Sequence, residues 1–294
     1  MAEEHRSKMS VAITLRDSWS HTPVTKGNVI HVSRLPSQKG AAQTSQAAQI
    51  ELNDSERSAF IIVEPDHMLS ATTAADSFDC IRKAVLQDRI KATAETSEPM
   101  VYGKVLHEIF QQALTNNRWD DVFLMELVDK TIQAHVDDLW ELGMRDTVQA
   151  TEKIKAKMGE LAAWAKVFVQ SQPSDKSLVE DRNGEKVWMS ISKLIAIEEH
   201  VWSPQYGLKG NVDATIQATL RDDPRRPPKQ LVTPFEVKTG RTTQSTAHHA
   251  QTALYTLLLS DRYDVSVQAG ILYYLESSAM SRIAPPVREV RQMV

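Results

Sequence analysis

"VTPFEVKTGRTTQSTAHHAQTALY", residues 232–255, is the stretch of this sequence that best indicates the fold. Its first part alternates, so that Phe235 and Val237 share one face of a predicted strand while Glu236 and Lys238 share the other. An acid and a lysine with this spacing are common on solvated strands. The stretch predicts a strand, and its neighbours must decide whether the strand is catalytic.

The segments on either side of this strand predict an α/β core with a mixed sheet. "GLKGNVDATIQATL", residues 207–220, alternates strictly and reads as the preceding strand. A helical pattern of roughly 246–261 follows, and "VQAGILYYLE", residues 267–276, is a nearly continuous apolar run typical of a strand buried on both faces. Strands that alternate with helices in this way are typical of α/β proteins.

The patterns along the chain predict two domains. Residues 1–66 have β character and predict a small β-barrel or sheet, although the polar segment 36–58 within them predicts a weakly ordered loop. Residues 67–294 predict a larger domain with a helical insert of about 118–172.

Two helical patterns precede the insert. Residues 70–90 predict a helix because four apolar residues recur near the helical period: Phe78, Ile81, Val85 and Ile90. Residues 100–114 form a second apolar stripe with His107 at its border. A histidine in that place is either a satisfied core residue or a ligand.

Composition limits the classes of function. The 294 residues carry a net charge of −4, so binding to a polyanion would need a local basic groove. No run of about 18 apolar residues indicates a membrane span, and the N-terminal residues lack a secretory pattern, so we expect a soluble, intracellular chain. The single cysteine, Cys80, cannot form an internal disulfide or hold a tetrahedral thiolate site alone.

Asp213 and Glu236 suggest a hydrolytic site. They lie on the polar faces of consecutive strands, and a hairpin would bring the two carboxylates side by side. Such a pair raises one pKa unless a cation joins it, and oxygen ligands favour Mg²⁺ or Mn²⁺. Lys238 could then orient or deprotonate a water, or neutralise charge on a phosphate. An aspartate followed by Glu-x-Lys is the minimum apparatus for metal-assisted phosphodiester hydrolysis.

Four motifs in order carry a family resemblance: "LHEIF" (106–110), "GLKGNVD" (207–213), "FEVKTG" (235–240) and "QTALY" (251–255). They resemble the motifs of the RecB-like subgroup of PD-(D/E)xK nucleases. Longer stretches are similar to the nuclease domain of the eukaryotic helicase/nucleases of DNA replication, and "LRDSWSHTPVTKGNVIHV" (15–32) is similar to the OB-like β-barrel before it. The resemblance implies a restriction-endonuclease-like core with a mixed central sheet.

The resemblance implies roles for individual residues. His107, Asp213, Glu236 and the backbone carbonyl of Val237 would bind Mg²⁺ or Mn²⁺, while Lys238 would assist the water nucleophile. Gln251 and Tyr255 would brace the site and contact the single strand. Arg82, Lys83 and Arg241, with Tyr255, are candidates for the path of a single strand, although Arg82 and Lys83 could equally be exposed charges of a helix. Glu198 or Glu199 would support the site, or serve a structural or solvated role.

In the same family, Cys80 would be the first of four cysteines that hold a 4Fe–4S cluster. The other three are absent from this sequence, so the cluster cannot be completed here. A Gly-x-x-x-x-Gly-Lys-Ser/Thr loop for ATP is also absent. We therefore expect an N-terminal piece of a larger helicase/nuclease, truncated before its helicase domain.

The expected function is that of a magnesium-dependent deoxyribonuclease, an endonuclease that cuts single-stranded DNA at 5′ flaps and ends. By family analogy it would act in Okazaki fragment processing, end resection and repair, in the nucleus and in a mitochondrial pool, with a single-strand-binding protein as partner and no membrane association. Two alternatives stay open: a catalytically inactive DNA-binding module, and a related recombination or phage nuclease.

Overall fold

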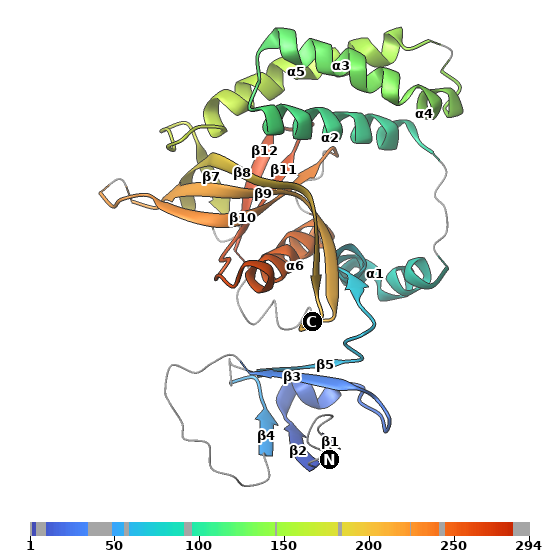
Figure 1. Ribbon diagram of the computed structural model, residues 1–294, viewed down its shortest axis with the longest axis vertical. Helices are drawn as coiled ribbons and strands as arrows, with labels where there is room; N and C mark the ends of the chain where they lie inside the picture. Colours follow the sequence, from blue (N-terminus) through green and yellow to red (C-terminus); the bar gives the residue numbers. More distant parts are fainter. Residues whose placement is uncertain are drawn as a thin grey trace. The chain divides into compact units, whose positions relative to one another are not determined.

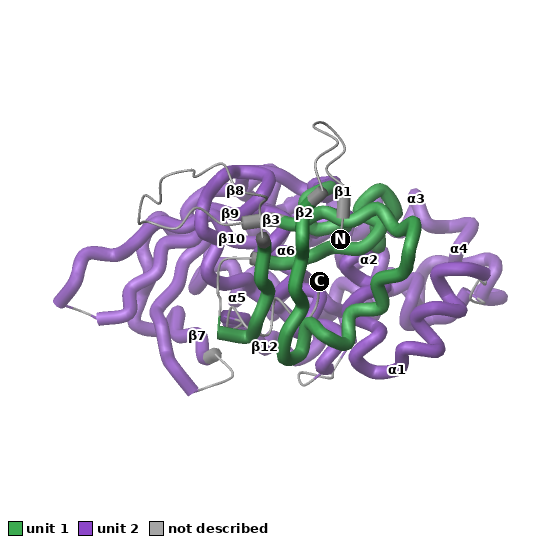
Figure 2. The backbone as a smooth tube through the Cα atoms, turned by 90° about the horizontal axis from the view of Figure 1, so that it is seen from below, with its two compact units in different colours: residues 1–69, 203–208, 286–294 green, residues 70–202, 209–285 purple. Residues whose placement is uncertain are grey.

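Strand β10 (Lys229–Lys238) carries the predicted acid–lysine pair, Glu236 and Lys238, at its end (Figure 1). The computed structural model describes residues 2–3, 10–34, 49–55, 59–90, 96–144, 146–181, 184–223, 225–240 and 245–284. The chain divides into two compact units (Figure 2): residues 1–69, 203–208 and 286–294 form the first, and residues 70–202 and 209–285 form the second.

The sheet of the second unit is mixed, as predicted. Its strands are β6 (Leu69–Ser70), β7 (Leu178–Asp181), β8 (Lys186–Ser203), β9 (Leu208–Arg221), β10, β11 (Gly270–Tyr274) and β12 (Ala279–Ile283), in the order β10-β11-β12-β7-β8-β9-β6, with β10 also paired to β9. β10 runs parallel to β11 and antiparallel to β9. All five residues of β11 are buried, which confirms the strand predicted to be buried on both faces.

Helices cover both faces of this sheet (Figure 1). They are α1 (Ala71–Ile90), α2 (Glu98–Asn116), α3 (Asp121–Ala134), α4 (Val136–Glu141), α5 (Val148–Phe168) and α6 (Thr246–Tyr263). α2 lies on one face with α3 and α5 above it, while α6 lies on the other face with α1 packed against it. Two of these helices, α3 and α6, begin at a capping side chain: Asp120 accepts from the Phe123 N–H, and Ser245 accepts from the His248 N–H.

An aromatic cluster joins α2 and α5 to the sheet. Phe110 stacks on Phe235 with ring centroids 5.7 Å apart, and Trp164 stacks on Tyr273 at 4.6 Å. Such pairs add to the free energy that burial of their area contributes. Because Phe110 lies about one helical turn after His107, this contact fixes the histidine over the end of β10.

The helix predicted over residues 70–90 is present, but its apolar residues face outward. Phe78 is 45% exposed, Ile81 71% and Ile90 68%, while the small side chains of Ala71, Ala75 and Ala84 are buried. The helix is interrupted at Cys80, whose backbone is extended (φ −160°, ψ 103°). Among the described residues, no helix is both long enough and apolar enough to cross a bilayer.

The first unit is a small β structure. β1 (Ala2–Glu3), β2 (Ser10–Leu15) and β4 (Gln49–Leu52) form one sheet, and β3 (Ile30–Arg34) pairs with β5 (Ala59–Val63). The prediction of a loop over 36–58 is wrong for β4, because Leu52 is only 1% exposed and contributes to an apolar core. The described pairings form two separate sheets, so the OB-like barrel stays a prediction.

Candidate active site

The site begins where β9 and β10 diverge. The two strands pair antiparallel from Lys229 opposite Leu220 to Phe235 opposite Ala214, and one further step of this register places Glu236 opposite Asp213. Beyond that point the side chain of Asp213 replaces the missing backbone acceptor, since its Oδ2 accepts from the Val237 N–H at 2.7 Å. The divergence therefore brings both carboxylates to the end of β10.

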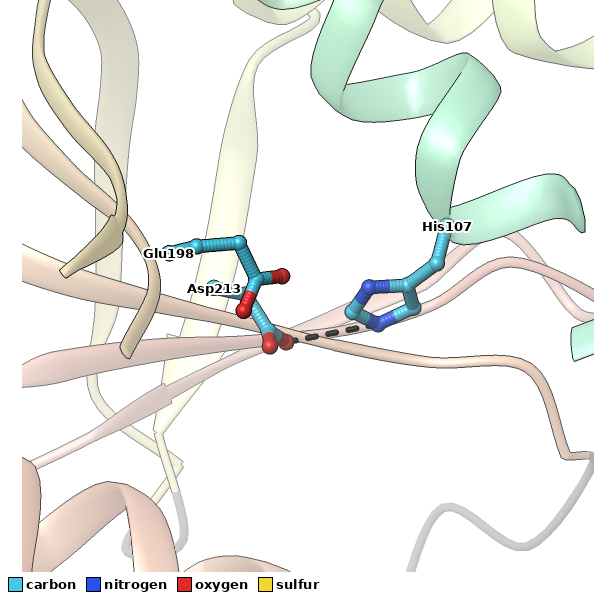
Figure 3. A group of neighbouring side chains, drawn as sticks. All are labelled: His107, Glu198 and Asp213. Carbon is cyan, nitrogen blue, oxygen red and sulfur yellow. Dashed lines mark ion pairs between the residues drawn. The ribbon is translucent and has the colours of Figure 1, made fainter. Parts of the chain in front are cut away.

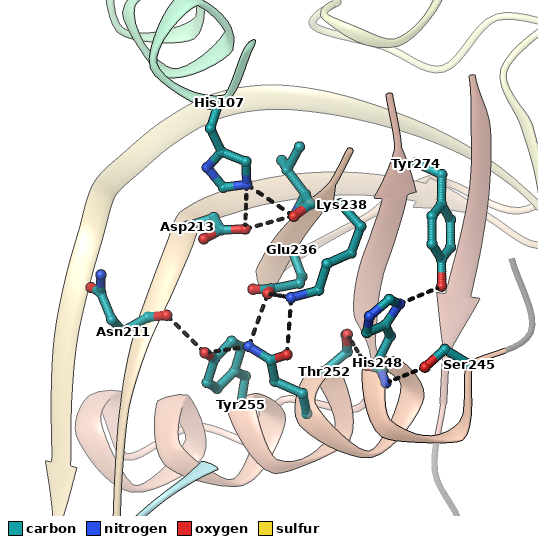
Figure 4. Close-up of polar contacts among 12 residues, drawn as sticks. His107, Asn211, Asp213, Glu236, Lys238, Ser245, His248, Thr252, Tyr255 and Tyr274 are labelled. Carbon is teal, nitrogen blue, oxygen red and sulfur yellow. Dashed lines mark hydrogen bonds and ion pairs between the residues drawn. The ribbon is translucent and has the colours of Figure 1, made fainter. Parts of the chain in front are cut away.

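His107 reaches the same point from α2 (Figure 4). Its Nε2 lies 2.9 Å from the carbonyl oxygen of Val237 and 3.4 Å from Oδ2 of Asp213. An imidazole nitrogen, a carboxylate oxygen and a carbonyl oxygen thus converge from three elements. These donor types suit a divalent cation.

Glu198 adds a further carboxylate (Figure 3). Ligand atoms of His107, Glu198 and Asp213 lie within 4.8 Å of one another. Glu198 adopts a left-handed backbone conformation (φ 48°) within β8, and its carboxylate accepts from the side-chain amides of Gln111 and Asn211. A non-glycine residue in this conformation is uncommon and is found at functional sites.

The structure distinguishes Glu198 from Glu199, either of which could support the site on the sequence alone. Glu199 is turned away from the site: it accepts from the Thr215 hydroxyl and, at 2.9 Å, from the Tyr263 hydroxyl. Strict alternation cannot assign the two acids, because the left-handed residue interrupts the pleat. No sequence signal for a positive φ exists at a glutamate.

Glu236 is the most deeply buried acid of the group, only 2% exposed. Its Oε1 accepts from Lys238 Nζ at 2.7 Å and from Gln251 Nε2 at 2.9 Å, but its buried Oε2 has no partner among the described residues. A buried acceptor without a partner is unfavourable. Because a cation would satisfy it, the residues present fit a divalent metal.

Burial dominates the acid–base properties of the pair. It is the main cause that raises the pKa of Glu236 to about 8, and repulsion from the Asp213 carboxylate adds to it. Burial likewise raises the pKa of Asp213 to about 7, opposed by the hydrogen bond from the Val237 N–H and by the charge of Lys238. Because burial disfavours the charged forms of Asp213 and Glu236, a cation bound between the two carboxylates would stabilise both of them.

Gln251 and Tyr255 hold the site in place from α6 (Figure 4). Gln251 Oε1 accepts from Lys238 Nζ at 3.0 Å, and its Nε2 donates to Glu236 and to the Tyr255 hydroxyl, which in turn donates to the Asn211 carbonyl at 2.8 Å. Both side chains are buried. This supports the bracing role, while contact with a strand stays a prediction.

A cavity of about 490 Å³ opens onto these residues. His107, Asp213, Glu236, Val237, Lys238, Gln251 and Tyr255 all line it. Arg82 and Lys83 instead line a separate cavity on α1, together with Cys80. Arg241 lies outside the described residues. The structure thus brings together the seven residues expected at the metal and its support, and it does not bring Arg82 and Lys83 to them.

The comparisons with known proteins identify the family. Residues 4–218 match the family model described as DNA replication factor Dna2. The chain belongs to the Dna2 family. This finding confirms the resemblance seen in the motifs.

Relatives across eukaryotes agree with the Dna2 assignment. The chain is 32% identical to the DNA replication ATP-dependent helicase/nuclease dna2 of Schizosaccharomyces pombe, over 95% of this chain and 19% of the relative. It is 30% identical to the human DNA2 helicase/nuclease, over 90% of this chain and 24% of the relative. It is 29% identical to JHS1 of Arabidopsis thaliana, over 97% and 21%. The chain therefore spans about a fifth to a quarter of these relatives.

The iron–sulfur cluster that the Dna2 resemblance implies does not fit the residues present. Cys80 is the single cysteine of the sequence, and it is exposed. A 4Fe–4S cluster needs four thiolates. One exposed thiol does not provide such a site.

Proposed function

We propose that this chain is a metal-dependent deoxyribonuclease that cuts single-stranded DNA. The observation that carries the proposal is the convergence of His107 Nε2, Asp213 Oδ2 and the Val237 carbonyl beside Oε2 of Glu236, which has no partner in the part of the chain that the structure describes. Membership of a family whose relatives are named helicase/nucleases supports it.

His107, Asp213, Glu236 and the Val237 carbonyl would hold the ion, with Glu198 close enough to join them. A bound Mg²⁺ or Mn²⁺ supplies an activated water and neutralises charge on the phosphate. In the hydrolysis a water oxygen bonds to phosphorus, the bond from phosphorus to one sugar oxygen breaks, and that oxygen takes up a proton.

Lys238 is the residue that we assign to the water. Its ammonium is held between Glu236 Oε1 and Gln251 Oε1, so its position is fixed. Its side chain is 23% exposed, so a water in the cavity can still contact it. The ammonium held there orients the attacking water and stabilises charge that develops on the phosphate. Gln251 keeps the ammonium in place.

The domains, substrates, location and partner that we propose rest on the family as well. We propose that residues 67–294 form a PD-(D/E)xK nuclease domain and residues 1–66 an OB-like barrel. We further propose that the substrates are 5′ flaps and DNA ends in replication and repair, that the site of action is the nucleus with a mitochondrial pool, and that a single-strand-binding protein is a partner. The names of the relatives support a role in replication.

A flap-cleavage assay tests the hydrolytic site. Glu236→Gln and Lys238→Ala should each lower cleavage in Mg²⁺ by at least about a hundredfold, since each removes a group aimed at the reacting atoms. Lys193→Ala is the matched control, because Lys193 is an exposed lysine on β8 that does not line the cavity. Undiminished cleavage by both site variants, or binding without any cleavage by the wild type, would contradict the proposal.

A further inference from the structure

The mouth of the catalytic cavity carries an exposed tryptophan. Trp202, near the end of β8, is 66% exposed and lines the same cavity of about 490 Å³ as Asp213 and Glu236. His200 and Lys209, both exposed, line it as well. Packing within the fold does not explain why a large aromatic ring is exposed at the entrance of the cavity, so we ask whether it contacts a ligand.

Trp119, Trp164 and Trp188 of the second unit have partners, whereas Trp140, like Trp202, is exposed but lies on α4 away from the cavity. Trp119 and Trp164 pack against Phe110, and Arg221 lies over the ring of Trp188 at 5.3 Å. Within the described ranges, Trp202 has neither a ring partner nor a cation over its face. Most of its indole is thus accessible to a planar ligand.

Strand β8 connects this ring to the site. Glu198, His200 and Trp202 alternate along β8 as exposed residues, and Glu198 lies beside His107 and Asp213. Four residues of extended strand span about 13 Å. This equals about four nucleotides at the 3.4 Å spacing of a stacked strand.

We propose that Trp202 is the platform on which a base of the entering single strand stacks, a few nucleotides from the reacting phosphate. The inference rests on the proposed nuclease function, whose substrate passes through this cavity. Base stacking on an aromatic ring tolerates any sequence, which suits a nuclease that must accept many strands. Lys209, which lines the same cavity, supplies the local positive charge that a polyanion needs on a chain of net charge −4.

Binding measured without a metal tests this proposal independently of cleavage. Fluorescence anisotropy with a labelled 20-nucleotide thymidine strand, in EDTA, would give the Kd of the full chain and its variants. Trp202→Ala should weaken binding by about 5- to 100-fold, the range for one lost base stack, while Trp202→Phe should keep most of the affinity. Trp140→Ala is the control, because Trp140 on α4 is 68% exposed and does not line the cavity.

A strand of the same length without bases separates stacking from contacts to phosphate. On that strand the Trp202→Ala variant should bind as well as the wild type. An equal loss on both strands, a change within twofold on the thymidine strand, or the same loss in Trp140→Ala would overturn the stacking role.

The two proposals fail in different ways. A wild type that cleaves flaps, with a Trp202→Ala variant that binds normally, overturns the stacking role and leaves the nuclease in place. A wild type that binds strands through Trp202 and never cleaves overturns the nuclease and leaves the stacking role in place.

Discussion

At the scale of single residues, Gly210 shows how closely α6 approaches the site. A Cβ at this position would lie 2.7 Å from Tyr255 Cε1 and 2.9 Å from Leu258 Cδ1. Gly210→Ala should therefore lower the free energy of unfolding by about 1–3 kcal/mol, the cost of overpacking. Gly159→Ala is the control: this glycine of α5 has open space around it, so alanine should stabilise the helix by up to about 1 kcal/mol. Urea unfolding would show opposite signs, and equal effects would contradict the close approach.

Gln251 is a second residue with a separable role. Gln251→Leu keeps the volume but removes the hydrogen bonds to Glu236, Lys238 and Tyr255. We expect cleavage to fall about 10- to 100-fold, as for residues that orient catalytic groups, and stability to fall by about 1–3 kcal/mol.

The control for that variant is Gln230→Leu, which removes one exposed contact with Gln217 at the far end of the β9–β10 hairpin. Cleavage rates and urea unfolding curves, measured side by side, would give both quantities. If Gln251→Leu cleaved as fast as Gln230→Leu, Gln251 would not position Lys238.

At the scale of elements, the first turn of α6 carries a pH dependence. Burial is the main cause that lowers the pKa of His248 to about 4, and the charges of Lys238 and His249 add to it, while Asp79 of α1 opposes them. Its Nδ1 lies 3.0 Å from the hydroxyl of Tyr274 on β11. The folded state therefore holds the neutral ring.

The direction in which pH changes the free energy of unfolding follows from the pKa of His248 in the unfolded chain, about 6.5, which lies above its folded value. The contribution of His248 is fully present above pH 6.5 and is lost as the pH falls towards 4, by up to about 3 kcal/mol. His248→Gln should show a shallower decline of unfolding free energy between pH 6.5 and 4, and His200→Gln, at an exposed site, should follow the wild type. Parallel curves for His248→Gln and wild type would contradict this reading.

The elements also show how far the sequence alone could predict the site. The alternation in β9 and β10 predicted that Asp213 and Glu236 lie on the polar faces of consecutive strands, because a strand repeats every two residues, and the two strands do pair antiparallel up to Phe235 opposite Ala214. The choice between Glu198 and Glu199 could not be predicted, because the left-handed backbone at Glu198 breaks that repeat. The exposure of the apolar residues of α1 could not be predicted either, because a helical period indicates which residues share a face but not whether another element covers that face.

At the scale of the whole molecule, metal binding should stabilise one unit only. The proposed ligands all lie in the second unit, residues 70–202 and 209–285. At ten times its Kd a metal ion contributes about 1.4 kcal/mol, which raises the Tm of a unit of this size by about 3–6 °C.

Differential scanning calorimetry with Mn²⁺ or Mg²⁺ would measure this shift. Sodium chloride of equal ionic strength should not reproduce it, and Asp213→Asn should reduce it strongly, because the variant loses a charged ligand. The same shift in Asp213→Asn as in the wild type would place the ion elsewhere.

The sequence by itself determined the secondary structure around the site, the mixed α/β class and, through four motifs in order, the family. These features are local periods and short spacings, which a chain displays before it folds. The resemblance already implied that His107 and the Val237 carbonyl meet, but only the tertiary structure decided that Glu198 joins them in place of Glu199, and that Trp202 stands open at the entrance. Those placements come from where β9 and β10 part and from how α2 and α6 pack on the sheet, and no local pattern contains that information.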